Sequence, residues 1–135
     1  MGANSMNNLI DILIRWTMRR WAFRSDIRKM YNAVLLVESQ YQLYLWHENL
    51  DPNEQPKIKV IKTLIYGVRS SGNQAERALR VTVEKCRHLY PKAFDVITND
   101  TYVDDCMSGT DSEDEGHLTM DEVQLSVGMG GFSII

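Results

Sequence analysis

The chain has little of what several classes of protein require. It holds two cysteines, Cys86 and Cys106, in neither a CxxC pair nor the spacing of a zinc site, so we expect reduced thiols. No apolar run reaches the roughly 18 residues that a membrane span needs, and the first residues lack the basic segment and apolar block of a secretory signal. These absences favour an intracellular, cytoplasmic protein with no membrane partner.

Basic residues are missing from the last third of the chain. All 15 Lys and Arg lie in residues 1–92 beside eight Asp and Glu, a net charge of +7, whereas residues 93–135 carry ten acids and a net charge of −10. A basic body beside an acidic end suits a protein that binds phosphate and gathers carboxylates for cations. Solvated helix faces are the alternative interpretation of the same charges.

Hydrophobic periodicity predicts a mixed fold. Leu9, Leu13 and Trp16 recur at helical spacing, and the alternation over 57–65 is typical of a strand. We expect capping boxes at two helix starts, Ser71 with Gln74 and Thr110 with Glu113. The expected elements, in chain order, are a helix over 6–20, a strand over 22–26, an apolar strand-like segment over 33–37, a hairpin of 41–46 with 57–65, a helix from 71 to about 90, strands over 94–98 and 102–107, and a helix to about 127. This order predicts the α+β class, with a small antiparallel sheet packed on helices.

Three aspartates form the candidate chemical site. Asp104 and Asp105 lie in the segment Tyr102-Val103-Asp104-Asp105, between apolar neighbours, and Asp26 lies 78 positions upstream at the end of an expected strand. Phosphoryl transfer through two divalent ions needs carboxylates held on rigid backbone, and magnesium prefers such hard oxygen ligands. An Asp-Asp pair at a hairpin bend beside an Asp at a strand end meets these needs, although Asp is common in turns for other reasons.

Four segments, in order, carry a resemblance to a known family. They are Asp26-Ile-Arg-Lys-Met-Tyr31, Ile65-Tyr-Gly-Val-Arg-Ser-Ser-Gly-Asn-Gln-Ala-Glu76, Tyr102-Val-Asp-Asp105 and Gly130-Gly-Phe132. Together they resemble the palm motifs of reverse transcriptases, and in style those of BEL/Pao-type LTR retrotransposons. The resemblance covers roughly residues 8–135. It implies a partial reverse-transcriptase palm, with residues 1–20 as an N-terminal helix leading into a palm segment over 21–135.

The resemblance implies a role for each matching residue. Asp26 and Asp104 would be metal ligands and Asp105 the third carboxylate, with two Mg²⁺ ions as cofactors and Mn²⁺ as a substitute. The implied activity is RNA-directed DNA synthesis on an RNA or DNA template-primer from deoxynucleoside triphosphates, in the cytoplasm or in element particles. The basic residues expected to help hold phosphates are Arg19, Arg20, Arg24, Arg28 and Lys29.

Aromatic and glycine positions complete the implied site. Tyr31, five positions after Asp26, would exclude a ribose 2′-hydroxyl, although a core tyrosine is the equal alternative from the residue alone. Tyr66 and Gly67 would flank the incoming nucleotide. The resemblance places Tyr102 and Val103 against the primer end and the nucleotide.

The sequence departs from the family pattern in two ways. Gly72 follows the paired serines where many relatives have proline, and the lysine-bearing segment, the primer-gripping hairpin, the thumb and the RNase H part are missing. We therefore expect little or no activity of the chain alone, and keep a non-catalytic remnant acting as an interaction domain as the alternative. A partial EF-hand pattern over 111–122 has Glu at two tight-loop positions, which favours an acidic helix start instead.

Overall fold

The computed structural model describes residues 6–49, 51 and 53–135. Within these ranges the chain forms four α-helices, a three-stranded antiparallel sheet and a two-stranded antiparallel sheet. The predicted α+β class is confirmed. No helix in the described ranges has both the length and the apolar character needed to cross a bilayer.

The three-stranded sheet has the order β1-β5-β4, where β1 is Trp21–Asp26, β5 is Asp105–Thr110 and β4 is Thr101–Tyr102. Strand β1 pairs with β5 over its full length, from Trp21 opposite Thr110 to Asp26 opposite Asp105. The last residues of the chain run along the other edge of β1, through an antiparallel bridge between Ile27 and Ile134. The end of β1 is therefore held on both sides.

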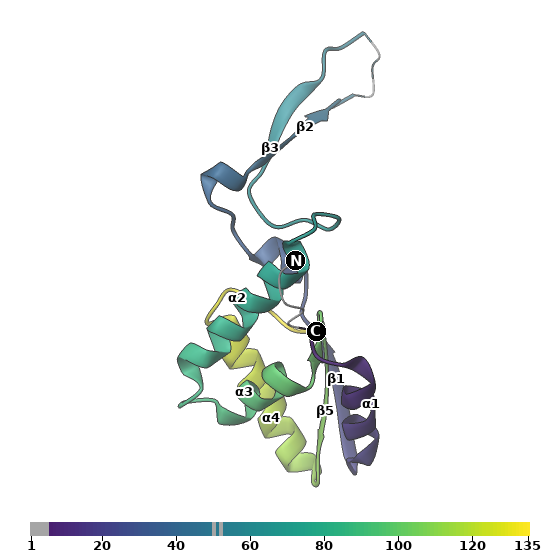
Figure 1. Cartoon of the computed structure of the whole chain (residues 1–135), viewed down its shortest axis with the longest axis vertical. Coiled ribbons are helices and arrows are strands. Elements are labelled where there is room, and N and C mark those ends of the chain that lie inside the picture. Colours follow the sequence, from purple (N-terminus) through teal and green to yellow (C-terminus); the bar gives the residue numbers. More distant parts are fainter. Residues whose placement is uncertain (1–5, 50, 52) are drawn as a thin grey trace.

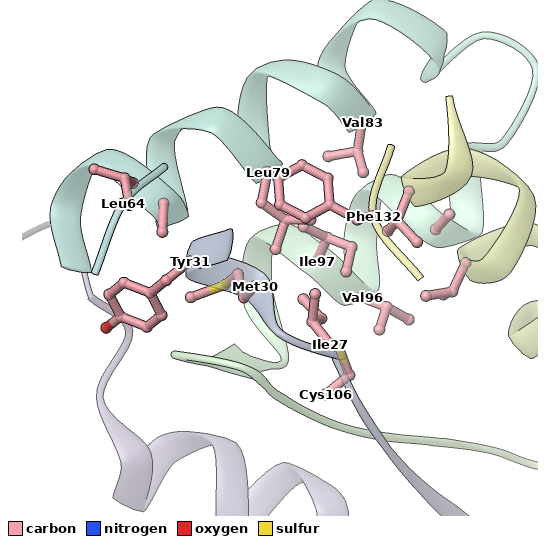
Figure 2. Packing of buried hydrophobic residues seen from close by; sticks show 14 residues of the cluster. Ile27, Met30, Tyr31, Leu64, Leu79, Val83, Val96, Ile97, Cys106 and Phe132 are labelled. Carbon is pink, nitrogen blue, oxygen red and sulfur yellow. The ribbon is translucent and has the colours of Figure 1, made fainter. Parts of the chain in front are cut away.

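Helices cover both faces of this sheet. Helix α1 (Leu9–Met18) lies on one side of β1 and β5, and α3 (Pro91–Asn99) and α4 (Glu113–Gly128) lie on the other, with α2 (Ser71–Cys86) packed beyond them (Figure 1). The buried cluster lies between the sheet and α2–α4 (Figure 2). Its largest members are Ile27, Met30, Tyr31, Leu64, Leu79, Val83, Val96, Ile97, Val123, Val127 and Phe132.

A β-hairpin projects from this body (Figure 1). Strand β2 (Gln42–Trp46) pairs with β3 (Lys57–Ile61), which confirms the predicted hairpin with a shorter second strand. The register puts Leu43 opposite Val60 and Leu45 opposite Ile58, so these four aliphatic side chains share one face, and all four are exposed.

Two predicted strands are absent from the described structure. Residues 94–98 lie within helix α3, because Pro91 starts the helix and Ala93, Val96 and Ile97 are buried at helical spacing. Residues 33–37 make only a single bridge, Leu35 with Thr63, after a 3₁₀ helix over Met30–Ala33.

Both predicted capping boxes begin at the wrong residue. Helix α2 has Ser70 as its N-cap residue, and the Gln74 side chain donates to the Ser70 hydroxyl at 2.9 Å. Helix α4 is capped by Ser112, whose hydroxyl accepts from the backbone N–H of Glu115. In both cases a nearby serine replaces the residue inferred from spacing.

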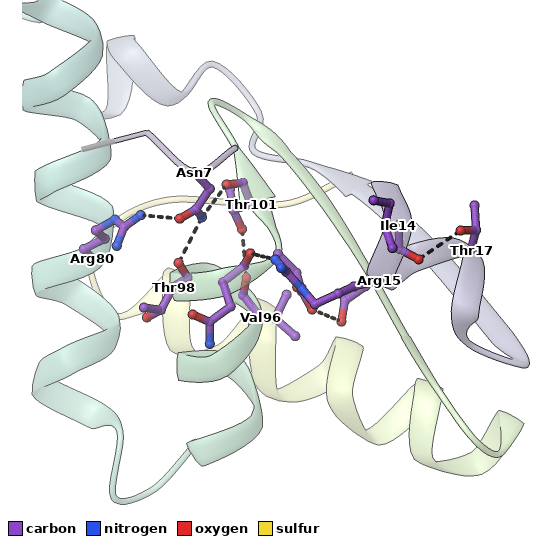
Figure 3. A network of polar contacts seen from close by, with 11 residues as sticks. Asn7, Ile14, Arg15, Thr17, Arg80, Val96, Thr98 and Thr101 are labelled. Atoms are coloured by element: carbon purple, nitrogen blue, oxygen red, sulfur yellow. Dashed lines mark hydrogen bonds and ion pairs between the residues drawn. The ribbon is translucent and has the colours of Figure 1, made fainter. Parts of the chain in front are cut away.

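Polar contacts tie the N-terminal segment to the start of the β4–β5 hairpin (Figure 3). The Asn7 amide donates to the carbonyls of Thr98 and Thr101, each at 2.9 Å, and its oxygen accepts from Arg80 on α2 at 3.2 Å. Arg15 on α1 binds the Asp100 carboxylate at 3.0 Å. These bonds fix the junction between α3 and β4, and with it the position of the hairpin that follows.

Gly130 lies where the end of α4 meets α2, and an added methyl group there meets Thr82. A Cβ atom at position 130 would clash with the Thr82 Oγ1 and lie 2.6 Å from its Cγ2. We expect Gly130→Ala to destabilise the fold by about 1–3 kcal/mol through overpacking, measured by urea unfolding. Gly128→Ala, where nothing lies within 4 Å, is the control. Adding Thr82→Ala to the Gly130→Ala chain should recover most of the loss, and no recovery would contradict the assigned clash.

Candidate functional site

The three predicted aspartates lie at one end of the three-stranded sheet. Asp26 exchanges both of its backbone hydrogen bonds with Ile135, at 2.9 and 3.0 Å. It therefore faces Asp105 as a non-hydrogen-bonded pair, the closer of the two antiparallel arrangements, with Cα atoms ~4.5 Å apart. Asp104 is the residue just before Asp105, and its carbonyl accepts from the N–H of Ile27 at 2.7 Å. The strand register thus brings the backbone of Asp26 beside Asp104 and Asp105, and the metal-binding role stays a prediction.

The bend of the β4–β5 hairpin carries backbone strain. Tyr102 pairs with Asp105, which leaves Val103 and Asp104 as the two bend residues. Val103 has φ 57°, in the left-handed region that a β-branched residue rarely adopts. A positive φ at the first bend residue is typical of a type II′ turn, where glycine is preferred. The strain, of order 1–3 kcal/mol, is held by the paired strands and by packing of Val103 against the core.

The carboxylate of Asp26 is electrostatically disfavoured. Burial raises its pKa above the usual value, and Asp104 and Asp105 raise the pKa further, while Arg24 lowers it. Like charges on directly opposed strand positions repel. The end of the sheet is therefore short of positive charge, which is the electrostatic condition that a bound cation would relieve.

Arg24 supplies part of that positive charge. Its Nε and Nη2 both donate to the Asp105 Oδ1, at 3.0 and 2.7 Å. Across the described ranges no three His, Cys, Asp or Glu side chains form a group that could hold a metal ion. The carboxylates of Asp26, Asp104 and Asp105 are the ligand type that Mg²⁺ prefers, but as they lie the three side chains do not form such a group, and one Asp105 oxygen is engaged by Arg24. The sequence suggested phosphate binding for Arg24 and did not reveal this pair.

The predicted nucleotide-side residues form a second group. The rings of Tyr31 and Tyr66 lie 4.2 Å apart between centroids. Tyr31 is 8% exposed and belongs to the buried cluster, with its hydroxyl pointing away from the other core side chains (Figure 2). Burial is the largest cause of the raised pKa of Tyr31, and the neighbouring Tyr66 and Asp104 raise the pKa further. Tyr31 is thus a core residue whose hydroxyl lies at the edge of the core, 3.5 Å from where a Cβ at Gly72 would be.

Besides Val103, two backbone positions near the site, at Gly67 and Lys29, are left-handed. Gly67 has φ +87° and open space where a Cβ would lie, so it lets the chain turn just after the exposed Tyr66. Lys29 has φ 49° and precedes the 3₁₀ helix that carries Tyr31. Lysine has no preference for this region.

The alternative sites weighed from the sequence do not form. Residues 113–122 are helical, which excludes an EF-hand loop there. Cys86 and Cys106 are free and buried, as expected, and burial raises the pKa of Cys106 to about 11, so its thiol stays protonated.

A hollow of about 560 Å³ lies between α2 and α3, lined by Arg77, Arg80 and Phe94 among others. None of the predicted site residues lines it.

The raised pKa of Asp26 predicts that removal of its charge increases folding stability by an amount that depends on pH. An acid whose pKa is higher in the folded chain destabilises the fold when it is ionised. This cost is fully present above the folded-state pKa and absent below the ordinary value of 3.8. In chelator, Asp26→Asn should therefore have a higher melting temperature than wild type at pH 7. The gain should shrink to nothing as the pH approaches 4. Asp95→Asn, at an exposed position of α3, is the charge-matched control, and an equal gain there would contradict the local origin.

Comparison with known proteins adds no assignment. The chain matches no family model and no curated protein.

Proposed function

We propose that this chain is a palm segment of a reverse transcriptase of the BEL/Pao retrotransposon type, with a two-metal site for RNA-directed DNA synthesis. The observation that carries the proposal is the strand register: Asp26 opposite Asp105, with Asp104 at the adjoining bend. Residues 78 and 79 positions apart in the sequence lie side by side, on backbone held by a sheet. Such rigid placement of carboxylates is what metal-assisted phosphoryl transfer requires.

Asp26 and Asp104 would hold the ions, and the free oxygen of Asp105 would complete the set. When bound, two Mg²⁺ or Mn²⁺ ions would lower the pKa of the primer 3′-hydroxyl and neutralise the triphosphate and the departing pyrophosphate. The chain itself contributes orientation. The strained Val103 bend fixes the direction of Asp104, and the pairing of β1 with β5 fixes Asp26.

The nucleotide would lie between the aspartates and the Tyr31–Tyr66 pair. Tyr66 is exposed and stands next to Gly67, whose missing side chain permits close approach of a ligand to the backbone. Tyr102, partly exposed beside Asp105, would face the primer end. Arg28 and Lys29, exposed just after Asp26, are placed to meet phosphates without reading bases.

The test is template-directed extension by the full chain. An RNA template annealed to a DNA primer, with the complementary deoxynucleotide and Mg²⁺, should give extended primer at low yield. Chelator should stop the reaction, and omission of the template should do the same. Full activity in chelator would exclude a two-metal site.

Tyr31 sets the choice of sugar in this proposal. Tyr31→Ala should raise ribonucleotide relative to deoxynucleotide incorporation by at least about tenfold, because the removed ring leaves room for the 2′-hydroxyl. The ratio is measured within one preparation, so a loss of folded protein cancels. Tyr31→Phe keeps the ring and should keep the ratio. An unchanged ratio in Tyr31→Ala would leave Tyr31 with only its core role.

A non-catalytic interaction domain is the second candidate. The observation that favours it is the Arg24–Asp105 ion pair, which engages an oxygen that a metal site would use. The two candidates differ in a simple measurement. A catalytic palm segment gains thermal stability from Mg²⁺ or Mn²⁺ at millimolar concentration, and a remnant without a cation site does not.

A further inference from the structure

Arg24 is placed by the strand register to act on the carboxylate pair. On β1, Arg24 and Asp26 are two residues apart and so project from the same face. Asp105 lies opposite Asp26 on the neighbouring strand, which puts Arg24 diagonal to it. Both Arg24 donors end on the same Asp105 oxygen, Oδ1, at 2.7 and 3.0 Å. The contact is thus built by strand geometry, and it uses one of the two Asp105 oxygens.

The pair is made of side chains that water reaches. The Arg24 side chain is 62% exposed and the Asp105 side chain 32%. Ion pairs of this kind contribute little, because water and salt screen them and two long side chains lose freedom. A divalent cation that binds several carboxylates at once carries twice the charge of a guanidinium and places it closer to the oxygens. The larger and closer charge of the cation should therefore outweigh the attraction of Arg24 for Asp105.

We propose that Arg24 is a displaceable counter-ion, which neutralises the Asp26–Asp105 pair and competes with the divalent cation for Asp105. The proposal rests on the proposed function and adds that Arg24 regulates metal binding at the same site. Arg24 would lower the affinity of the site for metal and stabilise the sheet end at low metal concentration. It is a positioning residue, because it acts through Asp105.

Lys85 offers a control for net charge. It is exposed in the last turn of α2, outside the proposed site. Replacing Lys85 removes one positive charge without touching Asp105, which separates a contact effect from a change in net charge.

The experiment measures Mn²⁺ binding by calorimetry on the full chain, starting from protein stripped with chelator. Arg24→Gln should bind Mn²⁺ about fivefold more tightly than wild type, the size of effect that an exposed ion pair allows. Arg24→Lys keeps the charge without the two donors to one oxygen, and should lie between wild type and Arg24→Gln. Lys85→Gln should change the affinity less than about twofold, because solvent and salt screen a charge without a direct contact.

A double variant tests whether Arg24 acts through Asp105. In an Asp105→Asn background, Arg24→Gln should no longer tighten Mn²⁺ binding, since double-mutant cycles isolate such coupling. Thermal unfolding gives a second readout: Arg24→Gln should melt below wild type in chelator and recover in saturating Mn²⁺. If Arg24→Gln fails to fold in chelator, the Mn²⁺ affinities of Arg24→Lys and wild type are compared instead. Tighter binding by Arg24→Lys supports the counter-ion role, and equal or weaker binding contradicts it.

The outcomes separate this proposal from the proposed function. Tight Mn²⁺ binding by wild type that Arg24→Gln leaves unchanged or weakens overturns the counter-ion role and leaves the metal site standing. Absence of Mn²⁺ binding in both chains overturns the counter-ion role together with the two-metal function. Binding that appears only in Arg24→Gln supports the counter-ion role most directly.

Discussion

Asp104→Asn is expected to abolish Mg²⁺-dependent primer extension by this chain, a loss of more than about a hundredfold. Asparagine keeps the size of the side chain but removes the negative charge that a divalent ion needs. The substitution keeps the Asp104 carbonyl, which accepts from Ile27 at 2.7 Å, so the bend should hold. Incorporation of a labelled deoxynucleotide under single-turnover conditions measures the effect.

Asp95→Asn is the matched control for this experiment. It removes one carboxylate from the same acidic part of the chain, at an exposed position of α3 outside the site. Extension should be unchanged. Circular dichroism of both variants shows whether the fold is intact. Undiminished extension by folded Asp104→Asn would refute the metal role of this aspartate.

Leu79→Ala is expected to cost the fold about 2–5 kcal/mol. Leu79 is 1% exposed and lies in the middle of the buried cluster, on the face of α2 that meets the core (Figure 2). Its truncation removes buried apolar surface and leaves a cavity that the packed neighbours cannot close. The melting temperature should fall by roughly 10 °C for a chain of this size, measured by differential scanning calorimetry.

Leu125→Ala, on α4, makes the same chemical change at a side chain that is 56% exposed. Its effect should stay within about 0.5 kcal/mol. Equal losses for the two variants would contradict the assignment of the core. Because Leu79 is remote from the aspartates in sequence and buried, Leu79→Ala also tests whether extension follows stability or local chemistry.

The elements with strong periodic patterns were predictable from the sequence. The alternation over 57–61 and the helical stripe of Ala75, Leu79 and Val83 each specify an element without help from distant residues. Strand β1 and the β2–β3 hairpin were also expected. The approach of Asp26 to Asp104 and Asp105 followed from the motif order, and the register then adds which aspartate lies opposite which.

The errors arose where local signals compete. Phe94, Val96 and Ile97 include β-branched and aromatic residues that favour strands, but Pro91 and the buried spacing of Ala93 with Val96 decide for a helix. The serine caps were misplaced by one or two positions because several adjacent hydroxyls satisfy the same pattern. The Arg24–Asp105 bond lies outside any local signal, since it depends on the pairing of strands 81 positions apart.

The left-handed Val103 has a consequence for sequence redesign. A procedure that optimised folding stability alone would replace this valine with glycine or asparagine, which occupy a positive φ at lower cost. Such a substitution would relieve the backbone strain but would also change the bend that carries Asp104. Folding stability and the proposed site therefore favour different residues at position 103.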